Sequence, residues 1–159
     1  MNLAFREARP SGSPHPSTAP RDRECLRLAV DRARAAGAAR VYLGGHSYGG
    51  RQSSMLAAEL PDLVPALLLL SYPLHPPGQP ERLRTAHFPN LRTASLFVHG
   101  VRDPFGSIEE LQSAMTLIPA RTSLLTIDGA GHELARKGVR KLEQVAGEIA
   151  ARFAQFVTS

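Results

Sequence analysis

Hydrophobic residues occur in two kinds of segment along this chain of 159 residues. The two kinds of segment follow one another along the sequence, and their order predicts the fold class. Short apolar runs without a polar face are typical of buried parallel strands. Such runs occur at residues 40–44, 66–71, 95–99 and 122–127. Apolar residues three and four positions apart instead indicate helices. They occur over residues 22–36, 49–60, 107–117 and 140–157. The alternation predicts an α/β fold in three layers, α/β/α, with a mostly parallel sheet.

Two proline-rich stretches, residues 10–20 and 73–80, are predicted loops, because proline lacks an N–H and disfavours helix in the residue before it. About twenty residues separate Ser71 from the strand that begins near Ala94, which leaves no room for a lid domain. The length predicts a single domain over residues 1–159, in which residues 1–20 hold a residual strand and the first proline-rich loop.

The charge of the chain limits the partners that we expect. The formal net charge of +5 comes almost wholly from arginines, which are scattered along the chain and never form a run longer than two. Faces that bind nucleic acid usually cluster basic residues, with aromatic rings among them, and here aromatic residues make up only 6% of the chain. We therefore expect a solvated basic surface and no nucleic-acid partner.

Cysteine usage and apolar runs indicate the compartment. Cys25 is the only cysteine, so neither an intrachain disulfide nor a thiolate metal cluster can form. The N-terminus lacks the basic and apolar segments of a secretory signal. The longest apolar run, residues 63–70, is far shorter than the ~20 residues needed to span a bilayer. We expect a cytoplasmic protein without a membrane partner.

The segment Gly45-His46-Ser47-Tyr48-Gly49 matches the nucleophile-elbow motif G-x-S-x-G. A predicted strand precedes it and a predicted helix follows it, as the motif requires. In such an elbow Ser47 stands in a strained turn, and glycines two positions before and after it remove Cβ atoms that would clash. The alternative is an ordinary tight turn with a capping serine.

Two further residues follow later strands in the order that a Ser–acid–His triad requires. Asp103 lies beyond the strand that ends at His99, and His132 lies in the glycine-rich loop after the strand 122–127. Loops at the carboxyl ends of parallel strands converge on one edge, so we expect Ser47, His132 and Asp103 to lie within hydrogen-bond reach in series. His132 would act as general base and Asp103 would fix its tautomer. Each residue also has a structural alternative that is equally good when it is considered alone. Asp103 could belong to an Asx-Pro turn, and His132 could be the residue at which a helix begins.

Neighbouring residues are candidates for the oxyanion hole and for substrate binding. The backbone N–H of Tyr48 is the expected first oxyanion donor, and His46 flanks the serine on its other side. His75 follows the strand 66–71 at the same edge and would line the pocket; its alternative is a loop histidine bonded to backbone. Arg51, one turn into the elbow helix, would bind a substrate carboxylate or, more simply, form a structural ion pair. No phosphate-loop or metal-ligand spacing occurs in the sequence, so no cofactor or metal is implied.

These motifs carry a resemblance to a known family. The chain resembles the dienelactone-hydrolase-like branch of the α/β-hydrolases, and within it a group that includes a testis-expressed protein and a scaffold subunit of a histone-acetyltransferase complex. The matching segments are residues 9–12, 45–51, 72–78, 102–106 and 128–132. The resemblance implies esterase-like or acyl-transfer chemistry on Ser47, without a defined substrate.

The resemblance also sets an expectation for the N-terminus. In α/β-hydrolases the nucleophile follows the fifth strand, and the second oxyanion donor comes from the loop after the third. Only 46 residues precede Ser47, so the first strands are expected to be missing, with residues 1–5 as a remnant of the fourth. We expect residues 1–5 to move inward and pair with the exposed strand at 41–43. In solution we expect instead poor solubility or a homodimer through this edge.

The favoured function is a serine hydrolase of small ester or thioester substrates, weakened by the missing oxyanion loop. One lost oxyanion donor typically costs ~2.7–4 kcal/mol of transition-state stabilisation. The alternative is a hydrolase-fold interaction module without turnover, as the resemblance to a scaffold subunit suggests.

Overall fold

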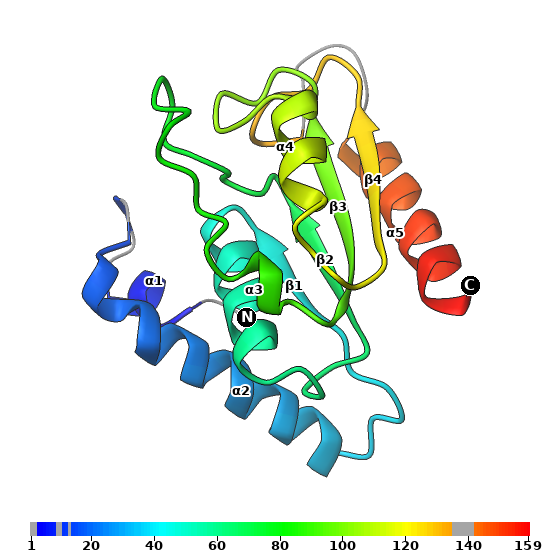
Figure 1. The fold of residues 1–159 in the computed structure, drawn as a ribbon. Coiled ribbons are helices and arrows are strands. Elements are labelled where there is room, and N and C mark those ends of the chain that lie inside the picture. Colours follow the sequence, from blue (N-terminus) through cyan, green and yellow to red (C-terminus); the bar gives the residue numbers. More distant parts are fainter. Residues whose placement is uncertain (1–2, 9–10, 13, 135–141) are drawn as a thin grey trace.

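A computed structural model describes residues 3–8, 11–12, 14–134 and 142–159, and its centre is a four-stranded parallel sheet (Figure 1). The strands lie side by side in chain order. They are β1 (Leu43–His46), β2 (Ala66–Leu70), β3 (Ala94–Gly100) and β4 (Thr122–Ile127). All four predicted strands are therefore present. The first begins three residues later than expected, because its pairing starts only where Leu43 lies opposite Leu67 of β2.

Helices cover both faces of this sheet, which confirms the predicted three-layer α/β/α fold. The longer helices are α2 (Ala19–Ala35), α3 (Tyr48–Glu59), α4 (Ile108–Met115) and α5 (Leu142–Thr158). The short ones are α1 (Ala4–Ala8) and the 3₁₀ turns η1 (Pro16–Thr18) and η2 (Phe88–Asn90). Helix α5 lies across the sheet from α2 and α3 (Figure 1). The first two residues predicted for the last helix lie outside the described residues.

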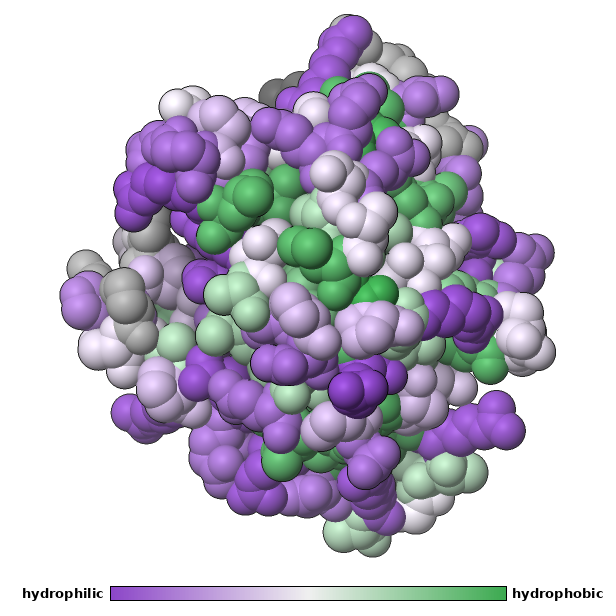
Figure 2. Space-filling model, viewed as in Figure 1, coloured by the Kyte–Doolittle hydropathy of each residue, from purple (hydrophilic) through white to green (hydrophobic). Residues whose placement is uncertain are grey.

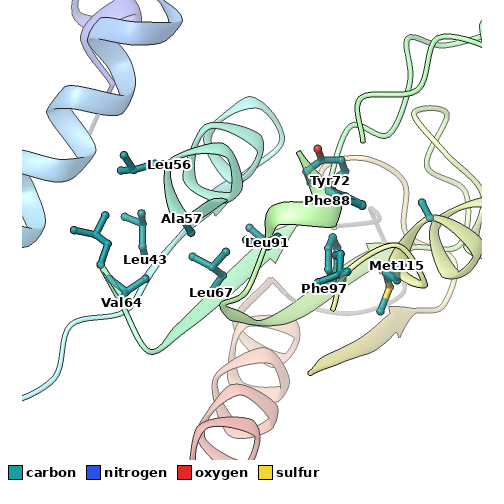
Figure 3. Packing of buried hydrophobic residues seen from close by; sticks show 14 of the residues in the cluster. Leu43, Leu56, Ala57, Val64, Leu67, Tyr72, Phe88, Leu91, Phe97 and Met115 are labelled. Atoms are coloured by element: carbon teal, nitrogen blue, oxygen red, sulfur yellow. The ribbon is translucent and has the colours of Figure 1, made fainter. Parts of the chain in front are cut away.

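Strand β3 shows why the strands are apolar on both faces. Phe97 points to the side of α3, where it packs with Tyr72 and Phe88 (Figure 3). Its neighbours Leu96 and Val98 point to the opposite side and pack with residues of α5. Successive side chains of a strand face opposite ways, so a central strand that is covered twice needs apolar residues throughout.

The register brings the carboxyl ends of the strands to one edge. His46 of β1 lies beside Leu70 of β2, which lies beside Val98 of β3, and Gly100 pairs with Ile127 of β4. The loops that follow β1, β3 and β4 therefore start close together. These loops carry Ser47, Asp103 and His132.

The N-terminal segment does not form the predicted strand. Residues Ala4–Ala8 are helical, and within the described residues β1 pairs only with β2, so the prediction that residues 1–5 fill the slot beside β1 is wrong. The buried carboxylate of Asp22 explains the difference, since its Oδ1 accepts the Phe5 N–H at 2.9 Å near the start of α1. Met1 and Asn2 lie outside the described residues.

On the face seen in Figure 2, hydrophobic surface lies in several patches separated by polar side chains. Among the described helices, none combines the length and the hydropathy that crossing a membrane requires.

Candidate active site

Ser47 occupies the sharp turn between β1 and α3. Its φ of 53° and ψ of −119° place it in the positive-φ region that side chains rarely adopt. The Ser47 N–H donates to the Leu70 carbonyl of β2 at 2.8 Å, which extends the sheet pairing by one residue and holds the strained turn. The strained elbow expected from the motif is therefore present.

The glycines of the elbow allow α3 to approach β1 closely. A Cβ on Gly45 would lie 2.7 Å from the carbonyl carbon of Gly49, and a Cβ on Gly50 would lie 2.6 Å from the Gly45 oxygen. Gly49 differs, because its Cβ would meet only a Leu3 methyl group at 4.0 Å. The expectation that the glycine two positions after the serine relieves a clash is thus wrong, and Gly50 has that role.

The loops after β3 and β4 lock together beside Ser47. The Arg102 N–H donates to the Ala130 carbonyl at 2.9 Å, and the Val101 N–H donates to the Ile127 carbonyl at 3.3 Å. A Cβ on Gly100 would lie 2.5 Å from the Gly131 oxygen, so only glycine lets the two loops come this close. These contacts fix the loop that carries His132 against the loop that carries Asp103.

The structure brings the three predicted side chains together in series. The Ser47 Oγ lies 2.8 Å from His132 Nε2, and His132 Nδ1 lies 2.9 Å from Asp103 Oδ2. An ionised carboxylate can only accept, so His132 Nδ1 carries the proton and Nε2 is free to accept from the serine hydroxyl. This is the tautomer that a general base acting on Ser47 needs.

Asp103 is held in its charged form. Burial alone would raise the pKa of this carboxyl group, but the hydrogen bonds from His132 and from the Phe105 N–H (2.9 Å) outweigh burial and lower the pKa below its ordinary value. The ring of Phe105 lies against the ring of His132, with centroids 4.2 Å apart. The imidazole is therefore held at its nitrogen by Asp103 and over its face by Phe105.

Tyr48 and His46 flank the serine in different ways. Tyr48 is the first residue of α3, so its backbone N–H has no acceptor within that helix, and the amide is available beside Ser47. Its side chain hydroxyl donates to Asp22 Oδ2 at 2.9 Å, and burial together with this bond raises the tyrosine pKa to about 12. His46 is exposed, and its Nε2–H donates to the His132 carbonyl at 2.7 Å.

Asp22 is a residue of the site that sequence reasoning missed. It is fully buried, and its two oxygens accept from the Phe5 N–H and from the Tyr48 hydroxyl. It thereby joins α1 and α2 to the first residue of the elbow helix. Nothing local distinguishes it from the other acidic residues of α2, since its partners lie 17 and 26 residues away.

His75 lies apart from the serine. Its Nδ1 donates to the Pro76 carbonyl at 2.8 Å, and its Nε2 lies 3.3 Å from Glu110 Oε2. The side chain is nearly buried and lines neither of the two pockets that contain Ser47. The structure therefore favours the alternative of a loop histidine bonded to backbone over a pocket-lining residue.

Two hollows meet at Ser47. One, of about 700 Å³, follows the outer side of β1 between Leu3, Gly45 and His132. The other, of about 540 Å³, lies over α3 and is lined by Arg51, Arg84 and Phe105 among others. A substrate with its carbonyl carbon at the Ser47 Oγ has room on both sides of the reacting bond. In the described part of the chain, no three His, Cys, Asp or Glu side chains are grouped so as to hold a metal ion.

A parallel α/β/α sheet with a serine in a strained strand–helix turn at its carboxyl edge is the architecture of α/β-hydrolases. The chain belongs to the alpha/beta hydrolase domain family, whose profile matches residues 5–158. This confirms the α/β-hydrolase family expected from the sequence, whereas the resemblance to the group with a testis-expressed protein and a scaffold subunit stays a prediction.

Solved structures share this fold at low sequence identity. The predicted CIB-like hydrolase of Thermoplasma acidophilum is 19% identical, with a TM-score of 0.62 over 89% of this chain and 60% of that one. Est1E of Butyrivibrio proteoclasticus is 18% identical, with a TM-score of 0.69 over 89% of this chain and 72% of that one. The dienelactone hydrolase of Anabaena variabilis is 20% identical, with a TM-score of 0.64 over 88% and 60%. The chain thus spans about three fifths of the length of the first and third of these proteins.

Proposed function

We propose that this chain is a serine hydrolase that cleaves small esters or thioesters, with Ser47 as nucleophile, His132 as general base and Asp103 as the residue that orients His132. The observation that carries the proposal is the unbroken series of hydrogen bonds from Ser47 Oγ to Asp103, at 2.8 and 2.9 Å. It begins at a serine held in a strained backbone conformation beside two pockets.

The geometry supports a two-step acyl transfer. As Ser47 Oγ attacks the substrate carbonyl carbon, His132 Nε2 takes the hydroxyl proton, and the Asp103 carboxylate stabilises the imidazolium that forms. The Tyr48 N–H donates to the oxygen that becomes negative. His132 then gives its proton to the departing alcohol or thiol, which leaves an acyl-serine. Water, activated by the same imidazole, attacks the acyl-serine, releases the acid and restores the Ser47 hydroxyl.

The structural neighbours support an ester as substrate class. They include a dienelactone hydrolase, Est1E with bound ferulic acid and a monoacylglycerol lipase of Paleococcus ferrophilus. The 23 residues between β2 and β3 (71–93) form no separate domain over the site, which favours small substrates reaching an open pocket.

The second candidate function is an interaction module of the hydrolase fold. It is favoured by the outer edge of β1, which no other strand of the described residues pairs. An unpaired strand edge can bind a strand of another chain, including a second copy of this one. The resemblance to the group that contains a scaffold subunit leads to the same alternative.

Labelling with a fluorophosphonate separates the two functions, because the probe reacts with an activated serine and not with a fold. We expect the folded protein to be labelled, with the adduct mapped to the peptide that contains Ser47. Ser47→Ala should abolish labelling and ester turnover, while Ser113→Ala, an exposed serine on α4, serves as the matched control. No labelling of Ser47 in protein with a cooperative melt would contradict the hydrolase proposal.

A further inference from the structure

The pocket over α3 carries an unusual balance of charge. Among the described residues that line it, the only ones with a formal charge are Arg51 and Arg84, and no carboxylate lines it. Ser47 lines the same pocket, so the two guanidinium groups belong to the hollow that opens at the nucleophile. Half-buried cations are usually paired with an acid. The sequence leaves open that Arg51 forms a structural ion pair. Within the described residues, however, no carboxylate pairs with Arg51.

Arg51 is close to the reacting serine and its guanidinium is incompletely bonded. Its backbone N–H donates to the Ser47 carbonyl at 3.0 Å, so the side chain leaves the helix one turn beyond the nucleophile. Its Nε is buried and has no hydrogen-bond partner. A buried donor without a partner is costly, and such a group in a cleft is typical of a site completed by a ligand.

The acids that lie nearest along these elements have other partners. Asp22 accepts from Tyr48 and from Phe5. Glu59 pairs with Arg23 at 3.1 Å, and the same arginine donates to the Gln52 side chain at 3.0 Å. Neither of these two carboxylates is therefore free to turn toward Arg51.

Arg84 reaches the same pocket from the loop between β2 and β3. Its Nη1 donates to the Pro73 carbonyl at 3.2 Å, and its own carbonyl accepts the Tyr72 hydroxyl at 2.7 Å, so the residue is held by neutral groups. Burial and the nearby charge of Arg51 both lower the pKa of Arg84. Two arginines held close together repel each other, and an anion bound between them would relieve this repulsion.

We propose that Arg51 and Arg84 form a subsite for a carboxylate of the substrate, so that the natural substrate is a small ester or thioester that also carries a carboxylate. The inference rests on the proposed hydrolase function and narrows its substrate class. A planar guanidinium binds a carboxylate through two parallel hydrogen bonds, and Arg51 lines the pocket that opens at Ser47. Arg84 adds a second positive charge to the same anion.

Two pairs of substrates test the subsite, since the carboxylate can lie on the acyl side or on the alcohol side of the ester. Monomethyl and dimethyl glutarate differ by one charge on the acyl side, and 4-acetoxybenzoate and 4-acetoxybenzamide differ by one charge on the alcohol side. We expect kcat/KM to favour the charged member of at least one pair by tenfold or more. In Arg51→Gln and in Arg84→Gln this ratio should fall toward 1, which is a loss of about tenfold where the parent ratio is about ten. Arg51→Lys should retain part of the preference.

Arg92→Gln is the matched control, because Arg92 is exposed, lies outside the pocket and makes the same change in net charge. The ratio should be the same in this variant as in the parent. Circular dichroism melts show whether Arg51→Gln folds; if it does not, Arg51→Lys and Arg84→Gln carry the comparison.

Binding of glutarate to Ser47→Ala, measured by calorimetry, separates the subsite from the chemistry. We expect binding that weakens at least tenfold when Arg51→Gln is added. Binding without hydrolysis of any ester would overturn the hydrolase proposal and retain the carboxylate subsite. Hydrolysis of both members of each pair at equal rates, without glutarate binding, would overturn the subsite and retain the hydrolase.

Discussion

The substitution Gly50→Ala tests whether the close approach of α3 to β1 at the elbow requires glycine at this position. Its Cβ would lie 2.6 Å from the Gly45 oxygen, which belongs to the backbone of β1. An ordinary carbon–oxygen contact is about 3.3 Å or longer, so Gly50→Ala requires α3 and β1 to separate by roughly 0.7 Å. Gly49 is the natural control, because its Cβ would meet only one leucine methyl group at 4.0 Å.

The two substitutions should have opposite effects on stability. Replacing glycine with alanine in a helix stabilises it by up to about 1 kcal/mol, whereas forcing a methyl group into a packed site costs about 1–3 kcal/mol. We expect Gly50→Ala to lower the free energy of unfolding by about 1–2 kcal/mol and Gly49→Ala to leave it unchanged or raise it. A displacement near 1 Å in a reactive site costs about 100-fold in rate, so labelling of Ser47 in Gly50→Ala should slow by roughly 10- to 100-fold.

Urea unfolding followed by far-UV circular dichroism gives the first quantity, and the second-order rate constant of fluorophosphonate labelling gives the second. Both are measured on the same preparations of the parent and the two variants. The explanation of the elbow would be refuted if Gly50→Ala unfolded and reacted like the parent protein. It would equally be refuted if Gly49→Ala lost as much stability as Gly50→Ala.

Two further predictions follow from the charges in the site. Asp103→Asn should lower ester turnover by about 10³–10⁴-fold without loss of the fold, because an amide can donate to His132 Nδ1 and stabilise the wrong tautomer; equal turnover in the variant would contradict the role of Asp103. Burial, reinforced by Arg51 and Arg23, lowers the pKa of His87 to about 4, so the unfolded chain takes up a proton below pH 6.5 that the folded protein does not. The free energy of unfolding should therefore be highest above pH 6.5 and fall by about 2–3 kcal/mol toward pH 4, and His87→Gln should remove most of this fall. Equal slopes in the two proteins, from urea titrations at each pH, would show that other groups cause the loss.

The features that the sequence predicts well are those encoded by neighbouring residues. The strands follow from apolar runs, and their order fixes the edge to which Ser47, Asp103 and His132 belong, because parallel strands end on one side. The elbow follows from glycines around a serine between a strand and a helix. In each case the signal lies within about ten residues, and the tertiary structure does not have to be known.

The features that the sequence misses depend on partners far along the chain. Residues 4–8 are helical and not extended, because the buried carboxylate of Asp22 accepts the Phe5 N–H. Gly50, and not Gly49, needs to be glycine because α3 packs on the carbonyl of Gly45, a contact that exists only in the folded chain. That Arg51 has no carboxylate partner among the described residues is likewise apparent only from the folded structure, because it depends on the neighbours of every carboxylate.

The position of Asp22 suggests how the oxyanion donor and the nucleophile are fixed by separate parts of the fold. Ser47 is held through its N–H by Leu70 of the sheet, and the loops of Asp103 and His132 are held by each other. Tyr48, one residue on, is held at its far end by Asp22, which is anchored in α2 and also binds the N-terminal segment. Helix α3 therefore sets the direction of the Tyr48 N–H. The Tyr48 side chain is in turn held by Asp22, which belongs to the helical layer and not to the sheet. In the proposed mechanism, proton transfer from Ser47 to His132 would depend on the sheet edge and on the packing of α3 against β1, whereas stabilisation of the oxyanion would also depend on the packing of α1 and α2 against the elbow.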